Sequence, residues 1–253
     1  MWSGVAMVIV LLVGFQIAGF SPPPSPHDTA AQIAAIFRAH PDRIRLGLVL
    51  TMFGSALLGP FVAVTTVQMK RIEGPHSPLA YTQLALGALL AIEFIIPVGV
   101  LEAAAFHPGM SPATLHALDD VGWLLFVGAP STAIVETIVI GVVILQDRRP
   151  QPVFPRWGAY ASFICAALYI PGGLIVFFKT GPLAWNGAVA WWVGLSAFGV
   201  WLVLMTVLEL RAIAAQQLEQ QADGNDDGAS RLDTLSAEVA SLREQLQRVI
   251  ASR

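Results

Sequence analysis

Charged residues are scarce in this sequence. Asp, Glu, Lys and Arg make up 12% of its 253 residues, whereas hydrophobic residues make up 55%. A soluble domain averages about 25% charged residues, so this deficit excludes an ordinary soluble domain and indicates an integral membrane protein. The formal net charge is −3, and the basic residues lie at the ends of apolar segments instead of forming a patch. The sequence therefore predicts no nucleic-acid partner.

Cysteine and catalytic motifs are lacking as well. The single cysteine, Cys165, lies in an apolar run, so it cannot form an internal disulfide and is expected to be a small core residue. The sequence has no Cys/His spacing typical of zinc, no glycine-rich phosphate loop after a strand and no nucleophile elbow. It thus predicts no metal, no cofactor and no catalytic residue, and it favours a protein that is not an enzyme.

Long apolar runs are what the sequence has in abundance. A bilayer core of about 30 Å needs about 20 apolar residues in a helix. Five runs meet this condition, at 46–68, 80–105, 121–145, 158–178 and 186–209. A sixth run, 3–20, is shorter. We expect it to be a retained helix; a cleaved secretory signal is the alternative, although the Lys/Arg start of such signals is missing. The predicted fold class is all-α, a polytopic membrane bundle of six transmembrane helices.

Lysine and arginine near the span ends predict the orientation of the chain. One side holds more of them, including the tight pairs at 70–71 and 148–149, and the long C-terminal tail lies on the same side. We therefore expect both termini in the cytoplasm. Trp123, Trp157 and Trp185 lie at predicted span starts, where aromatic side chains usually face the membrane–water interface.

Two glutamates lie near the middle of apolar runs, Glu93 in "LLAIEFIIPVGVLE" and Glu136 in the following run. The loop between these runs is short, so the two helices should be antiparallel neighbours with both acids at similar depth. An ionised carboxylate there costs about 2.5–3.5 kcal/mol, so each acid should face the bundle, stay protonated or find a partner. Ser55, Thr132 and Tyr169 add hydroxyl groups at comparable depth. These five residues form the candidate intramembrane polar site; the alternative is that the acids only join helices by hydrogen bonds.

Proline interrupts four of the apolar runs, at Pro60, Pro97, Pro130 and Pro171. Each proline removes a helix hydrogen bond and frees a carbonyl one turn earlier, and the carbonyl freed by Pro97 belongs to Glu93. In a membrane such carbonyls need a neighbouring helix, a hydroxyl or water. Kinked helices around two acids therefore predict a polar pocket inside the bundle.

Two features are expected outside the membrane. The segment "HDTAAQIAAIFRAH" predicts an amphipathic helix near 29–40 that is capped by Asp28. This helix lies either on the membrane surface or bundle, or over a cavity mouth as a lid. A polar cluster is expected at the same side: Glu102, His107, His116, Asp119 and Asp120. Histidine and carboxylate can bind zinc, but such groups at a membrane surface are usually solvated, so no metal is assigned.

The sequence predicts three parts of the chain, two of them in the C-terminal region. Residues 1–212 form the predicted bundle, 213–230 a helical extension that ends in a flexible acidic linker, and 231–253 a coiled-coil segment. The seam is formed by apolar residues at alternating spacings of three and four: Leu232, Leu235, Val239, Leu242, Leu246 and Val249. Such a short helix is marginal alone, so the pattern predicts a parallel homodimer or homotrimer. The alternative is an amphipathic helix that lies on the protein's own cytoplasmic loops.

Several segments together resemble an uncharacterised family of six-helix bacterial integral membrane proteins, found mainly in actinobacteria and proteobacteria. The segments are "GFSPPPSP", "IRLGLVLTMFGSALLGPFVA", "QMKRIEG", "WLLFVGAP", "PVFPRWGAY" and "PGGLIVFFKTGPLAWNG". The resemblance covers about residues 10–212 and implies a six-helix bundle in the bacterial inner membrane. It implies no activity, substrate or catalytic residue. The start of the chain at its first apolar run and its heptad tail depart from the family pattern.

Two functions compete on this basis. The first is transport or binding of a small or hydrophobic compound, coupled to protonation of the intramembrane glutamates. The second is a non-catalytic membrane scaffold that oligomerises through its C-terminal coiled coil. A membrane enzyme is the weakest alternative because no nucleophile–base pair stands out. Besides membrane lipid, the expected partners are further copies of the chain and a small hydrophobic ligand.

Overall fold

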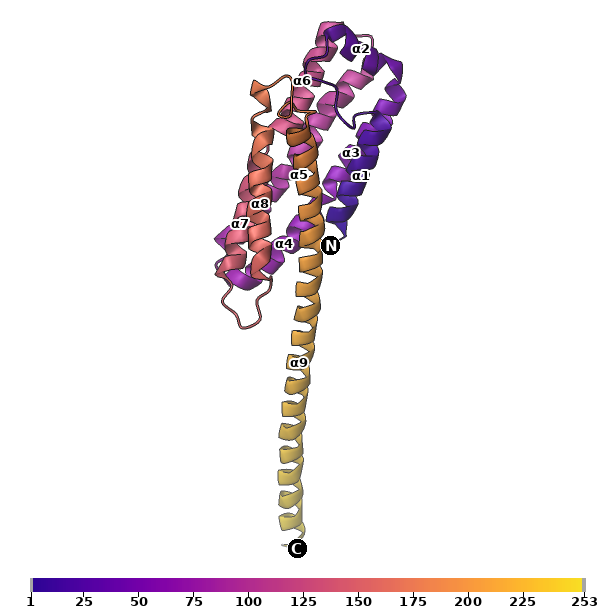
Figure 1. Cartoon of the computed structure of the whole chain (residues 1–253). Coiled ribbons are helices and arrows are strands. Elements are labelled where there is room, and N and C mark those ends of the chain that lie inside the picture. Colours follow the sequence, from indigo (N-terminus) through magenta and orange to yellow (C-terminus); the bar gives the residue numbers. More distant parts are fainter. Residues whose placement is uncertain (1, 252–253) are drawn as a thin grey trace. The chain divides into compact units, whose positions relative to one another are not determined.

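The structure is a computed structural model, and it describes residues 2–251 (Figure 1). In the C-terminal helix the side chains of residues 222–230, 232–233, 237, 240–247 and 249–251 lie outside this description. Every regular element in residues 2–251 is helical. These are α1 Ser3–Ala18, α2 Ala30–Ala39, α3 Pro41–Ala56, α4 Leu58–Glu73, α5 Pro78–Phe106, α6 Pro112–Gly128, α7 Ser131–Gln146, α8 Arg156–Gly173, η1 Ile175–Phe177, η2 Ala188–Val193 and α9 Gly194–Ala251.

Five helical stretches of the described chain are long and apolar enough to cross a membrane. They are Pro41–Glu73, Pro78–Phe106, Pro112–Gln146, Arg156–Phe177 and Ala188–Gln221. Each contains or largely overlaps one of the five long runs predicted from the sequence. Helix α1 is apolar but has only 16 residues, which corresponds to about 24 Å at about 1.5 Å per residue. The protein is therefore a membrane helix bundle.

Prolines break two of these stretches and leave two others continuous. Between α3 and α4 the helix is interrupted at Leu57, and Pro60 lies in the first turn of α4, where its missing N–H costs nothing. Between α6 and α7 the break falls at Ala129 and Pro130. Pro97 lies within α5 and Pro171 near the end of α8, both without a break in the helix. The sequence predicts that each of the four prolines interrupts a span. In the described structure only two of the spans are interrupted in this way.

Helix α5 is central, because it packs against α3, α4, α6 and α7, while α1 packs along α3 and α7 along α8 (Figure 1). The contact between α1 and α3 is close because glycines face each other there. A Cβ atom at Gly47 would lie 2.5 Å from Ala18 N and 2.8 Å from Ala18 Cβ, and one at Gly14 would lie 2.6 Å from Gly47 O. Small residues that let two backbones approach are typical of helix contacts in membranes.

The predicted amphipathic helix is present as α2, but its cap is different. Thr29 accepts a hydrogen bond from Gln32 N and forms a capping box with Gln32. The predicted cap, Asp28, instead accepts a hydrogen bond from Ser25 N at 3.0 Å and so closes the preceding turn. Helix α2 packs against α6, with Phe37 buried, so it lies on the bundle.

A cluster of aromatic rings fills the space between α1, α6 and η2. Trp123 makes edge-to-face or tilted contacts with Phe15, Phe20, Phe126 and Trp191, with ring centroids 5.5–6.0 Å apart. Trp123 is fully buried, so its side chain faces the inside of the bundle. Its depth at the membrane interface stays a prediction. Its indole N–H donates a hydrogen bond to Asp119 Oδ1.

Residues 210–253 form a unit separate from residues 1–209. The backbone of α9 is helical across residues 222–230, where the sequence predicts a linker; helix-favouring Ala, Gln, Leu and Glu on both sides offset the cost of its Gly, Asn and Asp residues. Leu235 and Val239 are 56% and 50% exposed. The side chains of the other seam residues lie outside the described part of the chain: Leu232, Leu242, Leu246 and Val249. The coiled coil stays a prediction.

Candidate functional site

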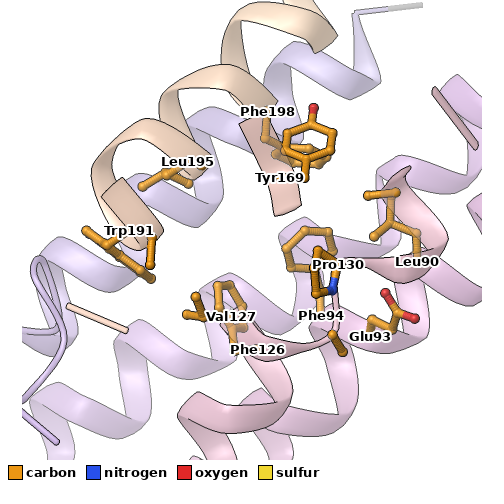
Figure 2. Close-up of a pocket in the computed structure, with 14 residues that line it drawn as sticks. Leu90, Glu93, Phe94, Phe126, Val127, Pro130, Tyr169, Trp191, Leu195 and Phe198 are labelled. Atoms are coloured by element: carbon orange, nitrogen blue, oxygen red, sulfur yellow. The ribbon is translucent and has the colours of Figure 1, made fainter. Parts of the chain in front are cut away.

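A cavity of about 100 Å³ lies inside the bundle, between α5, the α6–α7 break, α8 and the start of α9. Its walls are mainly apolar and aromatic, and Phe94, Phe126 and Phe198 form a connected group with ring centroids 5.3–5.4 Å apart. Figure 2 shows the lining side chains, with Glu93 and Trp191 at opposite ends of the group in this view. By the same volume measure a single water needs about 10–15 Å³, so the cavity can hold several waters or one small compound.

Two polar groups in the cavity lining are buried without a hydrogen-bond partner. Tyr169 is 6% exposed and Trp191 is 3% exposed. Neither the Tyr169 hydroxyl nor the Trp191 indole N–H has a partner in the part of the chain that the structure describes, although both residues line the cavity. Leaving a buried polar group unpaired costs about 1–3 kcal/mol. Such groups are therefore typical of a place where a bound molecule completes the hydrogen bonding.

Glu93 supplies the carboxyl group of the cavity. Its side chain is half-buried, and its Oε2 accepts a hydrogen bond of 2.5 Å from the Thr132 hydroxyl on α7. This bond fixes the carboxyl group in a partly apolar setting. The structure thus brings together three of the five predicted polar residues, because Tyr169 lines the same cavity.

Glu136 lies beside this cavity but does not line it. It is 2% exposed, and Gln83 Nε2 on α5 donates to its Oε1 at 2.9 Å. The Gln83 carbonyl oxygen in turn lies 2.7 Å from the Thr66 hydroxyl on α4. Glu93 and Glu136 are close enough to interact electrostatically. Glu136 therefore belongs to a polar chain across three helices.

Ser55 takes no part in either arrangement. It is fully buried in α3, and its hydroxyl donates to the Thr51 carbonyl oxygen at 2.8 Å. This bond to the carbonyl four residues earlier is common for serine in apolar helices. Ser55 is not among the residues that line the cavity.

The predicted external polar cluster is divided among three places. Asp119 is fully buried, and the Trp123 indole N–H donates to its Oδ1 at 3.0 Å, so the expectation of a solvated group is wrong for this residue. His116 and Asp120 are one turn apart, with 3.8 Å between His116 Nε2 and Asp120 Oδ1. Helical periodicity places 116, 119 and 120 on one side, but Asp119 is fully buried whereas His116 and Asp120 are partly exposed.

Glu102 and His107 line a separate groove of about 590 Å³ together with Arg45 and Phe106. The Arg45 guanidinium donates to the carbonyl oxygens of Ala105 and Phe106 at 3.1 and 3.2 Å. Among the described residues, no group of three or more His, Cys, Asp or Glu side chains is arranged to hold a metal ion.

Another buried acid, Glu209, is absent from the sequence prediction. It is fully buried in α9, the Thr65 hydroxyl donates to its Oε1, and its Oε2 has no partner within the described chain. The sequence places it near a span end, where a carboxylate is normally solvated. Gln83 and Trp191 were missed as well. A glutamine inside an apolar run is a signal for Gln83, but no local pattern marks Trp191 as a cavity residue.

The site therefore combines an aromatic cavity, one accessible carboxyl group, two unpaired hydrogen-bond groups and a second acid behind the wall. A mainly apolar and aromatic cavity with a few polar groups is typical of sites that bind small molecules. No protein-family model, curated protein or solved structure matches the chain.

Proposed function

We propose that the protein binds a small, largely hydrophobic compound in the cavity at Glu93, as part of its transport across the bacterial inner membrane. Binding is coupled to protonation of the intramembrane glutamates. The observation that carries the proposal is the pair of buried, unpartnered groups at Tyr169 and Trp191 in one aromatic cavity. In this proposal α1 is the sixth membrane helix, and both chain termini lie in the cytoplasm.

The chemistry of the cavity limits the compound. The Trp191 indole N–H can only donate a hydrogen bond, so an acceptor on the compound, such as a hydroxyl oxygen, would pair with it. Glu93 when ionised can only accept, so it favours a hydroxyl or an ammonium group on the same compound. Aromatic faces such as Phe94 and Phe126 also attract a cation. An engineered apolar cavity of about 150 Å³ holds benzene, so a compound of about five non-hydrogen atoms suits this one.

A direct test measures binding of n-butanol, n-butylammonium and butyrate to the purified protein in lipid nanodiscs, by tryptophan fluorescence. At a ceiling of about −1.5 kcal/mol per non-hydrogen atom, n-butanol can reach a Kd of about 3 μM at best. We expect butanol and butylammonium to bind and butyrate to be rejected by Glu93. Absence of a saturable signal with all three probes contradicts the proposal.

Matched variants assign the signal to the cavity. Trp191→Phe should abolish the fluorescence change, whereas Trp157→Phe should keep it, because Trp157 is 50% exposed and does not line the cavity. Glu93→Gln should weaken binding of butylammonium about 10- to 160-fold, since a hydrogen bond to a charged group contributes about 1.5–3 kcal/mol. Glu102→Gln, on the same helix but outside the cavity, should bind the probes like the unchanged protein.

The second candidate is an oligomeric scaffold, favoured by the exposed Leu235 and Val239 on α9. In this case the tail joins identical chains in a parallel dimer or trimer. The two functions differ in their sensitive residues. A scaffold should lose function when Leu235 and Val239 are both replaced by lysine, and it should keep function in Glu93→Gln. A transporter should lose function in Glu93→Gln and keep it in the double lysine variant.

A further inference from the structure

The polar chain of Thr66, Gln83 and Glu136 behind the cavity has more short polar contacts than hydrogen atoms available to form hydrogen bonds in them. Thr66 Oγ1 lies 2.8 Å from the Val62 carbonyl oxygen and 2.7 Å from Gln83 Oε1. Both of these atoms are acceptors, but a threonine hydroxyl carries one hydrogen. The Gln83 nitrogen provides the hydrogen for the third contact, 2.9 Å from Glu136 Oε1. With Glu136 ionised, three contacts thus share two hydrogens.

A proton on Glu136 removes this shortage. The nitrogen and oxygen of a glutamine amide have nearly the same shape, so a half-turn of the amide exchanges donor and acceptor without moving the neighbours. Then the Glu136 hydroxyl donates to the Gln83 oxygen, the Gln83 nitrogen donates to the Thr66 oxygen, and the Thr66 hydroxyl donates to the Val62 carbonyl. Each of the three contacts now holds its own hydrogen.

The surroundings of Glu136 favour the neutral carboxyl group. Gln83 is fully buried and Glu136 is 2% exposed, so no bulk water solvates a charge there. The titratable groups that interact with Glu136 from neighbouring helices are Glu93 on α5 and Tyr169 on α8, and neither supplies a positive charge. A Cβ atom at position 87 would lie 2.8 Å from Glu136 Oε1, so Gly87 leaves room for the carboxyl group against α5.

We propose that Glu136 is a proton-binding site of the bundle, and that the Gln83 amide turns by half when the proton leaves. The proton goes from the carboxyl oxygen to water or to Glu93, and the Thr66 hydroxyl then shifts from the Val62 carbonyl to the Gln83 oxygen. The state of Glu136 is in this way transmitted to α4. This inference deepens the proposed coupling to glutamate protonation, but its test needs no ligand.

Infrared difference spectroscopy of the full-length protein in nanodiscs provides the test, since protonated carboxyl groups and carboxylates have separate carbonyl bands. At pH 7 we expect a protonated-acid band that is lost in Glu136→Gln and kept in Glu102→Gln. Glu136→Gln should also keep the thermal stability, because its amide N–H donates to the Gln83 oxygen as the protonated acid does. An identical acid band in the unchanged protein and in folded Glu136→Gln overturns the proposal.

A second variant guards against a Glu136→Gln protein that does not fold. In Gln83→Leu the acid keeps its proton but loses its acceptor, so its carbonyl band should shift to higher frequency; an unshifted band overturns the proposed link. Probe binding, measured on the same samples, separates the two proposals. An acid band without probe binding contradicts only the ligand site, and probe binding without the band contradicts only the proton site.

Discussion

The hydroxyl group of Tyr169 allows a test in which stability and binding should change in opposite directions. Tyr169 is 6% exposed, and its hydroxyl has no partner in the described structure. Tyr169→Phe removes this group and keeps the ring. An unpaired buried polar group costs about 1–3 kcal/mol, and because water can enter the cavity we expect a gain near the lower limit, about 1 kcal/mol in the free energy of unfolding.

The same change should weaken binding of n-butanol. A neutral hydrogen bond contributes about 0.5–1.5 kcal/mol, so loss of the hydroxyl should raise the Kd about 2- to 12-fold. Unfolding by SDS in mixed micelles measures the first effect, and the tryptophan fluorescence titration in nanodiscs measures the second. If Tyr169→Phe is more stable but binds more weakly, the Tyr169 hydroxyl of the unchanged protein lowers stability and contributes to ligand binding.

Tyr160→Phe is the matched control, because Tyr160 lies on the same helix, is 58% exposed and does not line the cavity. We expect its stability within about 0.5 kcal/mol of the unchanged protein and an unchanged Kd. A loss of 1 kcal/mol or more in Tyr169→Phe would mean that the hydroxyl is already satisfied. The argument for a ligand at this group would then fail.

Other parts of the molecule give three further predictions. Gly47→Ala should lower the free energy of unfolding by about 1–3 kcal/mol because the added methyl meets backbone atoms of α1, whereas Gly59→Ala, with open space around it, should not lower it in the same SDS titration. Glu209→Gln should stay within about 1 kcal/mol, since an amide can also bond to the threonine opposite; a larger loss in that titration would require a charged Glu209. Replacement of Leu235 and Val239 together by lysine should reduce the protein to a monomer in light scattering, and an unchanged mass would contradict the coiled coil.

The sequence predicts the membrane bundle well because long apolar runs have one physical solution. In a bilayer every backbone polar group needs an internal partner, and a run of about 20 apolar residues meets this need as a helix. The five long runs therefore appear as helices. The 16-residue α1 is shorter than such a run, and its place as a sixth span rests on the proposal above.

The arrangement of the polar residues was less predictable, because side-chain direction depends on tertiary packing. Glu93, Thr132 and Tyr169 share one region, but Glu136 faces Gln83 behind it. Helical periodicity gives only relative angles within one helix, so it cannot show which neighbour receives each side chain. Asp119 shows the same limit, since its position on the helix does not indicate that its side chain is fully buried.

Two of the backbone irregularities of the bundle meet at the same cavity, and this is a second reason to test the cavity as a binding site. Ala129 and Pro130, where α6 and α7 separate, line it, and so do Ala190 and Trp191 of the π-helix η2. Non-helical backbone at membrane depth is tolerated only where protein buries it or where it lines a cavity, and π-helical turns are often found at functional sites. A space filled by apolar side chains would be more stable than a cavity of this kind. At this cavity the irregular backbone lies beside Glu93 of α5 and Tyr169 of α8, and η2 itself supplies the indole N–H of Trp191.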